Sequence, residues 1–118
     1  DDALSFGSVF IRAREIHSKG INECIQMIPE ANNYLITIDS DALDIAIAPG
    51  VLFPSPGGLT FEEITDLVQQ ISQKGQIAGL SLFEVRPEQD VNGLTASTAA
   101  QMIVNFIGTI VRSGQIGE

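Results

Sequence analysis

The chain has 118 residues, of which 44% are hydrophobic, and it carries a formal net charge of −9. This length suits one ordinary domain with a real core and is too short for two. The negative charge disfavours a nucleic-acid or anionic-membrane surface and suits metal ions or a cationic substrate. No segment reads as apolar for long enough to cross a membrane. From the charge and the apolar pattern together, neither a nucleic acid nor a membrane is expected as a partner.

The compartment is indicated by the cysteine count and by the start of the chain. Cys24 is the only cysteine, so no disulfide can form within the chain, which suits a reducing environment. The first five residues lack the basic and apolar regions of a signal peptide. We therefore expect a cytoplasmic protein.

Apolar patterns predict strands that alternate with helices. The expected elements are a strand at 8–12, a helix at 17–28, a strand at 34–39, a loop at 41–58, a helix at 60–75, a strand at 77–85 and a helix at 95–111. This order predicts an α/β fold with a parallel sheet covered by helices. The unbroken apolar runs at 34–39 and 77–85 are typical of strands buried on both faces.

Two of these elements carry clear local signals. Thr60 and Glu63 form the capping box of a helix, and Gly75 marks its end. The loop before this helix is rich in proline and glycine, and a loop of such length in a compact domain is usually functional or disordered. Asp44 is expected to cap a turn within it.

Three acids follow the two central strands. Asp39 and Asp41 stand one residue apart, where alternate residues of an ideal strand point the same way, and Glu84 ends the next strand. Parallel strands end at the same edge, so these acids should lie together there. Carboxylate oxygens suit a hard divalent cation.

Plain structural roles compete with each of these assignments. Asp39 and Asp41 are equally compatible with a solvated strand end, and Glu84 with an ion pair to Arg86. His17 is expected at the surface or at a helix start. Cys24 is expected as a small core residue, because no second cysteine or histidine completes a zinc site.

An ordered series of motifs resembles the C-terminal signature of the ureohydrolases, the arginase and agmatinase family. The motifs are Asp39-Ser-Asp41-Ala-Leu-Asp44, Ala48-Pro49-Gly50, Pro54-Ser-Pro-Gly-Gly-Leu-Thr60, Gly79-Leu-Ser-Leu-Phe-Glu84-Val-Arg-Pro87 and Asp90-Val-Asn-Gly-Leu-Thr95. The last of them is more similar to the agmatinase-like branch than to arginase proper. The resemblance covers nearly the whole chain and is far more specific than Asp-x-Asp alone.

The resemblance implies the C-terminal part of a three-layer α/β/α fold and a site with two manganese ions bridged by hydroxide. By position, Asp39 would bridge the ions, Asp41 would chelate one of them, and Glu84 would bind the guanidinium group of the substrate. The implied reaction is hydrolysis of an agmatine-like or arginine-like guanidino compound to urea and an amine. A homo-oligomer is also expected, since an incomplete sheet leaves an open edge.

The sequence departs from the family in one major respect. The remaining metal ligands of the family, a histidine and an Asp-x-His-x-Asp motif, lie upstream and are absent, as is the histidine assigned to proton transfer. His17 is in the wrong place to substitute, so we assign no catalytic residue within this segment. Residues 1–118 therefore read as a single partial domain, about the last two-fifths of a ureohydrolase, and the chain alone is expected to be inactive.

Two alternatives remain. A haloacid-dehalogenase-like phosphatase would use Asp39 as its nucleophile with magnesium, but it favours threonine or valine in place of Leu43. It also needs a lysine and a further acidic pair downstream, and no adjacent acidic pair follows Glu84. The third interpretation is a non-catalytic fragment that binds metal weakly or serves as an assembly surface.

Overall fold

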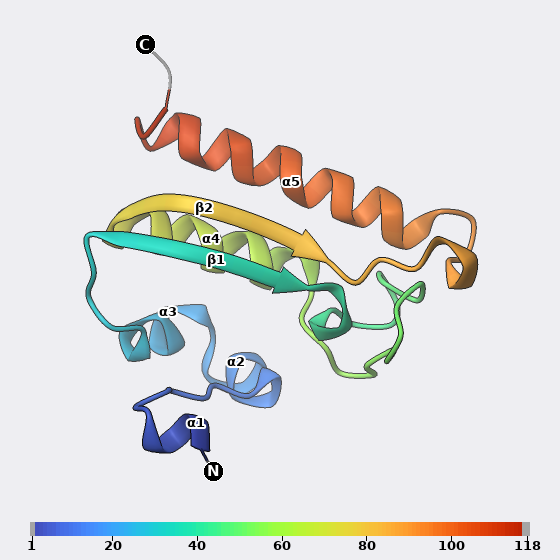
Figure 1. Ribbon diagram of the computed structural model, residues 1–118, viewed down its shortest axis with the longest axis horizontal. Helices are drawn as coiled ribbons and strands as arrows, with labels where there is room; N and C mark the ends of the chain where they lie inside the picture. Colours follow the sequence, from blue (N-terminus) through green and yellow to red (C-terminus); the bar gives the residue numbers. More distant parts are fainter. Residues whose placement is uncertain (1, 117–118) are drawn as a thin grey trace.

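The computed structural model describes residues 2–116, and its centre is a parallel pair of strands, β1 (Asn33–Asp39) and β2 (Gln76–Phe83). Helix α4 (Phe61–Lys74) connects the two strands, and α5 (Leu94–Arg112) follows β2 (Figure 1). Three short helices precede β1: α1 (Asp2–Ser5), α2 (Ala13–Lys19) and α3 (Ile21–Cys24). Single 3-10 turns occur at Ile25–Met27, Ser40–Ala42 and Pro87–Gln89. The expected α/β class with parallel strands is confirmed.

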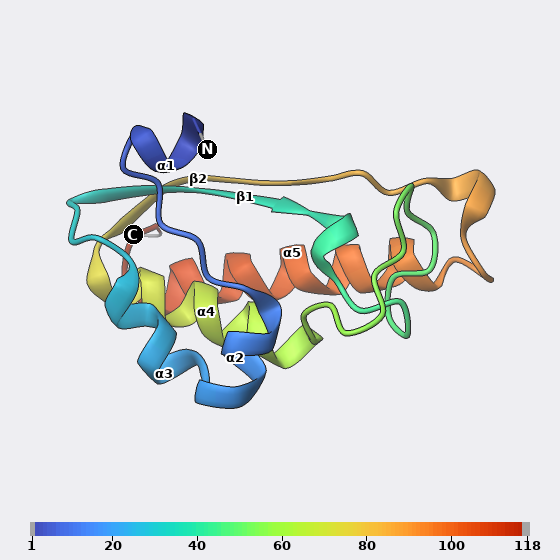
Figure 2. The same cartoon turned by 90° about the horizontal axis from the view of Figure 1, so that it is seen from below.

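Helices cover one face of this sheet. Figure 2 shows α2, α3, α4 and α5 on one side of the strands and only α1 on the other. Ile38 is buried against the helices, whereas Leu35 is 76% exposed and Phe83 45% exposed on the opposite face. The expectation of strands buried on both faces is therefore wrong for residues 2–116. An apolar run alone does not reveal whether a second layer of the same chain covers each face of a strand.

The core lies between the sheet and the pair α4 and α5. Its fully buried side chains include Val68 of α4 and Met102 and Phe106 of α5, which pack with Ile38 and Leu43. By length and composition alone, α5 is apolar enough to cross a membrane, a feature that the sequence analysis overlooked. In the fold, α5 buries one face against the core, while Val104 and Ile107 on its other face stay exposed.

The signals of α4 are confirmed in detail. The Thr60 hydroxyl accepts a hydrogen bond from the Glu63 amide (3.2 Å), and the Thr60 amide donates to the Glu63 carboxylate (2.9 Å). Gly75 follows the last residue of the helix, and its amide donates to the Ile71 carbonyl. The ends of α4 were predictable because both caps are local interactions.

The N-terminal third differs from expectation. Residues 8–12 form no strand, and Figure 1 shows them as the link between α1 and α2, well away from β1. A strand requires a hydrogen-bonded neighbour, which an apolar run by itself does not supply. The single helix expected at 17–28 is broken at Gly20, whose φ of 83° separates α2 from α3.

We predict that Phe106→Ala lowers the free energy of unfolding by about 3–5 kcal/mol, because it leaves a cavity in the core. Phe106 is 1% exposed, whereas Val104 on the same helix is 70% exposed and provides the matched control Val104→Ala. Urea unfolding of both variants of the complete protein measures the difference. Equal losses for the two variants would contradict this placement of the core.

Candidate active site at the carboxyl edge of the sheet

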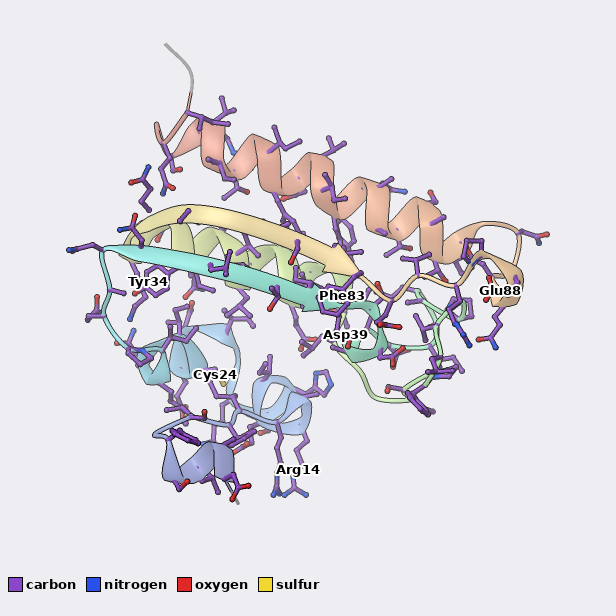
Figure 3. All side chains as sticks on the ribbon, in the orientation of Figure 1. Arg14, Cys24, Tyr34, Asp39, Phe83 and Glu88 are labelled. Atoms are coloured by element: carbon purple, nitrogen blue, oxygen red, sulfur yellow. The ribbon has the colours of Figure 1, made fainter. Side chains whose placement is uncertain are left out.

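The carboxyl ends of β1 and β2 meet at one edge of the sheet. Asp39, the last residue of β1, pairs with Phe83, the last residue of β2, and Glu84 follows directly. Figure 3 shows Asp39 and Phe83 side by side at the two strand ends. The expectation that the acids of both strands lie near one edge therefore agrees with the register of the sheet.

The sequence pattern suggested that Asp39 and Asp41 are alternate residues of one strand, but only Asp39 lies in the strand. The strand ends at Asp39, whose Oδ1 accepts a hydrogen bond from the Asp41 amide (2.9 Å) and so caps the 3-10 turn Ser40–Ala42. Oδ1 of Asp41 accepts a bond from the Phe53 amide (3.3 Å). Both side chains are half-buried, and among the described residues each keeps Oδ2 available to a ligand.

Ser40, between the two aspartates, was missed by the sequence analysis. Its side chain is fully buried, and its hydroxyl donates to the Phe83 carbonyl across the sheet (2.7 Å). The only sequence signal for this role was a small hydroxyl residue within Asp-x-Asp, and its acceptor lies 43 residues away. Pairing of the strands is needed to reveal it.

Glu84 is exposed and has a φ of 65°, a left-handed conformation that is rare for residues other than glycine. Arg86 pairs with Glu88 instead (Nε–Oε1, 3.6 Å), and within the described residues Glu84 makes no ion pair. Glu84 is therefore exposed at the sheet edge without the ion pair to Arg86, and its role in substrate binding stays a prediction. Such strain in the backbone often accompanies functional sites.

The irregular loop between β1 and α4 is folded tightly against this edge. The Asp44 carboxylate accepts bonds from the amides of Ala46 and Gly57, both at 2.8 Å, and these bonds lower the pKa of Asp44. Its predicted role as a turn cap is confirmed. A Cβ at Gly58 would lie 2.5 Å from the Leu43 carbonyl group, so this close approach requires glycine.

His17 has a role that its spacing did not indicate. Its Nδ1 lies 2.7 Å from Oε1 of Glu63, and its Nε2 lies 3.2 Å from the Gly57 carbonyl oxygen. Both partners accept hydrogen bonds, so the geometry favours the protonated imidazolium, which donates from both nitrogens. The contacts to Glu63 and then to Gly57 raise the pKa of His17. Cys24 is buried beside α2, as expected.

The acids at the sheet edge form an incomplete set of metal ligands. Nowhere in residues 2–116 do three or more histidine, cysteine or acidic side chains gather as a metal-binding group. Two carboxylates at the end of one strand nevertheless have the chemistry that a hard divalent cation prefers. Asp39 and Asp41 thus fit as part of a ligand set and not as a whole one.

Comparison with known proteins decides the family. The family model described as "Arginase family" matches residues 1–108. The chain belongs to the arginase family. The fold supports this assignment, since the described helices and strands match proclavaminate amidino hydrolase from Streptomyces clavuligerus with a TM-score of 0.85. That match has 27% identity and covers 96% of this chain and 39% of the hydrolase.

Relatives in the arginase family are much longer than this chain. N(1)-aminopropylagmatine ureohydrolase from Thermococcus kodakarensis is 28% identical over 106 residues, which are 90% of this chain and 36% of the relative. Putative agmatinase 3 from Schizosaccharomyces pombe is 31% identical over 121 aligned residues, covering all of this chain and 29% of the relative. The chain thus spans about a third of the length of these relatives.

The pairing of His17 with Glu63 predicts a pH-dependent stability. Because the pKa of His17 is raised, its contribution is fully present below the ordinary histidine value of about 6.5 and is lost as pH rises through the folded value. Burial by itself would raise the pKa of Glu63. The hydrogen bonds from Thr60 and His17 outweigh this effect, so the pKa of Glu63 is lowered. The contribution of Glu63 is therefore lost as pH falls through its folded pKa.

We expect the urea midpoint of the complete protein to fall as pH rises above about 6.5, and His17→Gln to flatten this fall. Lys19→Gln is the control, because Lys19 lies on the same helix and pairs with Glu23 only loosely, at 3.8 Å. An unchanged pH profile in His17→Gln would contradict the assignment.

Proposed function

We propose that the complete protein carrying this chain is a manganese-dependent ureohydrolase that converts a guanidino compound to urea and an amine. The observation that carries this proposal is that Asp39, Asp41 and Glu84 lie at or just after the paired carboxyl ends of β1 and β2, in a chain of the arginase family. Family membership argues against the phosphatase alternative, in which Asp39 would be a nucleophile.

The two aspartates supply part of the metal ligands in this proposal. Oδ1 of Asp39 accepts from the Asp41 amide and Oδ1 of Asp41 from the Phe53 amide, which restrains both carboxylates and leaves each Oδ2 for a ligand. When bound, manganese supplies an activated water nucleophile and stabilises negative charge that develops in the reaction. The other ligands are expected in the part of the protein that the relatives have and this chain lacks.

Glu84 is assigned to the guanidinium group of the substrate. A carboxylate forms charge-assisted hydrogen bonds with a planar guanidinium, and an exposed position at the edge leaves Glu84 accessible to it. The net charge of −9 attracts a cationic substrate. Proteins named agmatinase and arginase both match the chain, so the substrate is proposed only as a guanidino compound.

The extent of the domain, the compartment and the oligomeric state are also part of the proposal. Residues 1–118 would be one part of a larger ureohydrolase domain in the cytoplasm. The outer edges of β1 and β2 have no strand partner among the described residues, and such edges favour association with further strands or copies. We therefore retain a homo-oligomer as a proposal.

The function is tested with the complete protein loaded with Mn²⁺ and supplied with agmatine or arginine. Urea should form, and Asp39→Asn and Asp41→Asn should each lower bound manganese and urea release by roughly 100-fold or more, since losing even an outer partner of a metal ligand costs roughly 10–100-fold. Asp66→Asn, at an exposed position of α4, is the control. The 118-residue chain alone should release no urea, and a manganese-loaded complete protein without activity on any guanidino compound would refute the proposal.

Glu84→Gln should raise the KM for the guanidino substrate by about 10–100-fold, because a charge-assisted hydrogen bond is lost while the side-chain shape is kept. Manganese content should stay unchanged. Glu88→Gln removes another exposed acid of the same segment and should leave KM unaltered. Steady-state kinetics of both variants separate KM from kcat, and an unaltered KM in Glu84→Gln would remove this residue from the substrate site.

A further inference from the structure

Ser40 is a buried hydroxyl residue between two half-buried acids. Its side chain is 0% exposed, and its one hydrogen bond from Oγ goes to the Phe83 carbonyl at 2.7 Å. Buried hydroxyl groups need such partners, so the bond is a structural requirement of this position. It also joins the end of β1, which carries Asp39 and Asp41, to the end of β2.

The carbonyl that Ser40 contacts belongs to the peptide bond between Phe83 and Glu84. A peptide unit is planar, so a bond that holds this carbonyl also orients the Glu84 nitrogen, from which the φ torsion of Glu84 begins. That φ is 65°, which costs energy in any residue with a Cβ and persists only where the surroundings hold it. Ser40 supplies one such restraint.

The second restraint lies on the other side of Glu84. The Arg86 amide donates to the Gly50 carbonyl at 2.8 Å, so the backbone is held two residues after Glu84 as well. Gly50 is itself fixed, since its amide donates to the buried Thr95 hydroxyl at 2.7 Å. The exposed carboxylate of Glu84 therefore stands on a short segment that is anchored at both ends.

We infer that Ser40 is a positioning residue that holds Glu84 in its left-handed conformation and sets its carboxylate relative to Asp39 and Asp41. This inference rests on the proposed function, in which Glu84 binds the guanidinium group. Ser40 acts through Glu84 and touches neither substrate nor metal. Ser40 would thus determine the distance between the metal ligands Asp39 and Asp41 and the Glu84 carboxylate that binds the substrate.

The arrangement separates substrate binding from metal binding. Asp39 and Asp41 are oriented by the amides of Asp41 and Phe53, and neither bond uses the Ser40 hydroxyl. Removing the hydroxyl should therefore disturb Glu84 and leave the aspartates in place. A residue with only a structural role would not produce this separation.

The first test compares Ser40→Ala with Ser72→Ala in the complete protein. Ser72 is also buried, and its hydroxyl also donates to a carbonyl at 2.7 Å, that of Gln69 in α4, far from the strand ends. Ser40→Ala should raise the KM for the guanidino substrate about tenfold with bound manganese unchanged. Ser72→Ala should leave KM unaltered. In a Glu84→Gln background, Ser40→Ala should change KM less than about twofold, because coupled residues are not additive.

The second test does not depend on activity. Hydrogen exchange of the Arg86 amide should become about tenfold faster in Ser40→Ala and stay unchanged in Ser72→Ala, because release of Glu84 frees the bond to Gly50. Ser40→Cys keeps the side-chain size with a weak donor and should change the exchange in the same direction, which serves if Ser40→Ala does not fold.

Three outcomes discriminate between the ideas. Unchanged Arg86 exchange in both Ser40 variants overturns the positioning role, and so does an equal KM increase in the Glu84→Gln background. Absence of urea release from the unaltered protein overturns the proposed function alone, since the exchange measurement still decides whether Ser40 holds the Glu84 segment.

Discussion

Parallel pairing of β1 with β2 brings the carboxyl ends of two strands to the same edge, although α4 separates them in sequence. The register places Asp39 opposite Phe83, so the acids that follow each strand emerge next to one another. A parallel pair can form only when the connecting chain crosses back over the sheet, and α4 provides this crossover while it buries Ile64 and Val68 against the strands. The core and the candidate site thus depend on the same pairing.

The supports of the site come from three separate segments. The loop after β1 contacts Asp41 through Phe53, the segment after β2 contacts Gly50 through Arg86, and the start of α5 contacts Gly50 through Thr95. A Cβ at Gly50 would lie 2.6 Å from the Cβ of Asp90, so the loop can pack this closely on Asp90 only with glycine there. These hydrogen bonds and the close contact at Gly50 fix the irregular loop, so it can hold side chains in defined places.

Asp90 connects this packing to α5. Its carboxylate accepts bonds from the amides of Val91, Thr95 and Ala96, which offer donors at the start of the helix. Burial by itself would raise the pKa of Asp90. The hydrogen bonds from Thr95 and Ala96 outweigh this effect, so the pKa of Asp90 is lowered. The charge therefore remains in place at neutral pH beside the loop that supports the site.

The sequence by itself determined the interactions that are local or periodic. Both caps of α4, the turn from Asp44 to Ala46 and the apolar face of α5 depend on neighbours within a few residues, and the motif series indicated the family and the three acids. Only the tertiary structure decided which partners lie far apart in the chain: Ser40 with Phe83, and His17 with Glu63. It also decided that residues 8–12 form no strand and that one sheet face is exposed. The physical reason is that strand pairing, face burial and long-range hydrogen bonds depend on which segments meet in space, and no local pattern encodes that meeting.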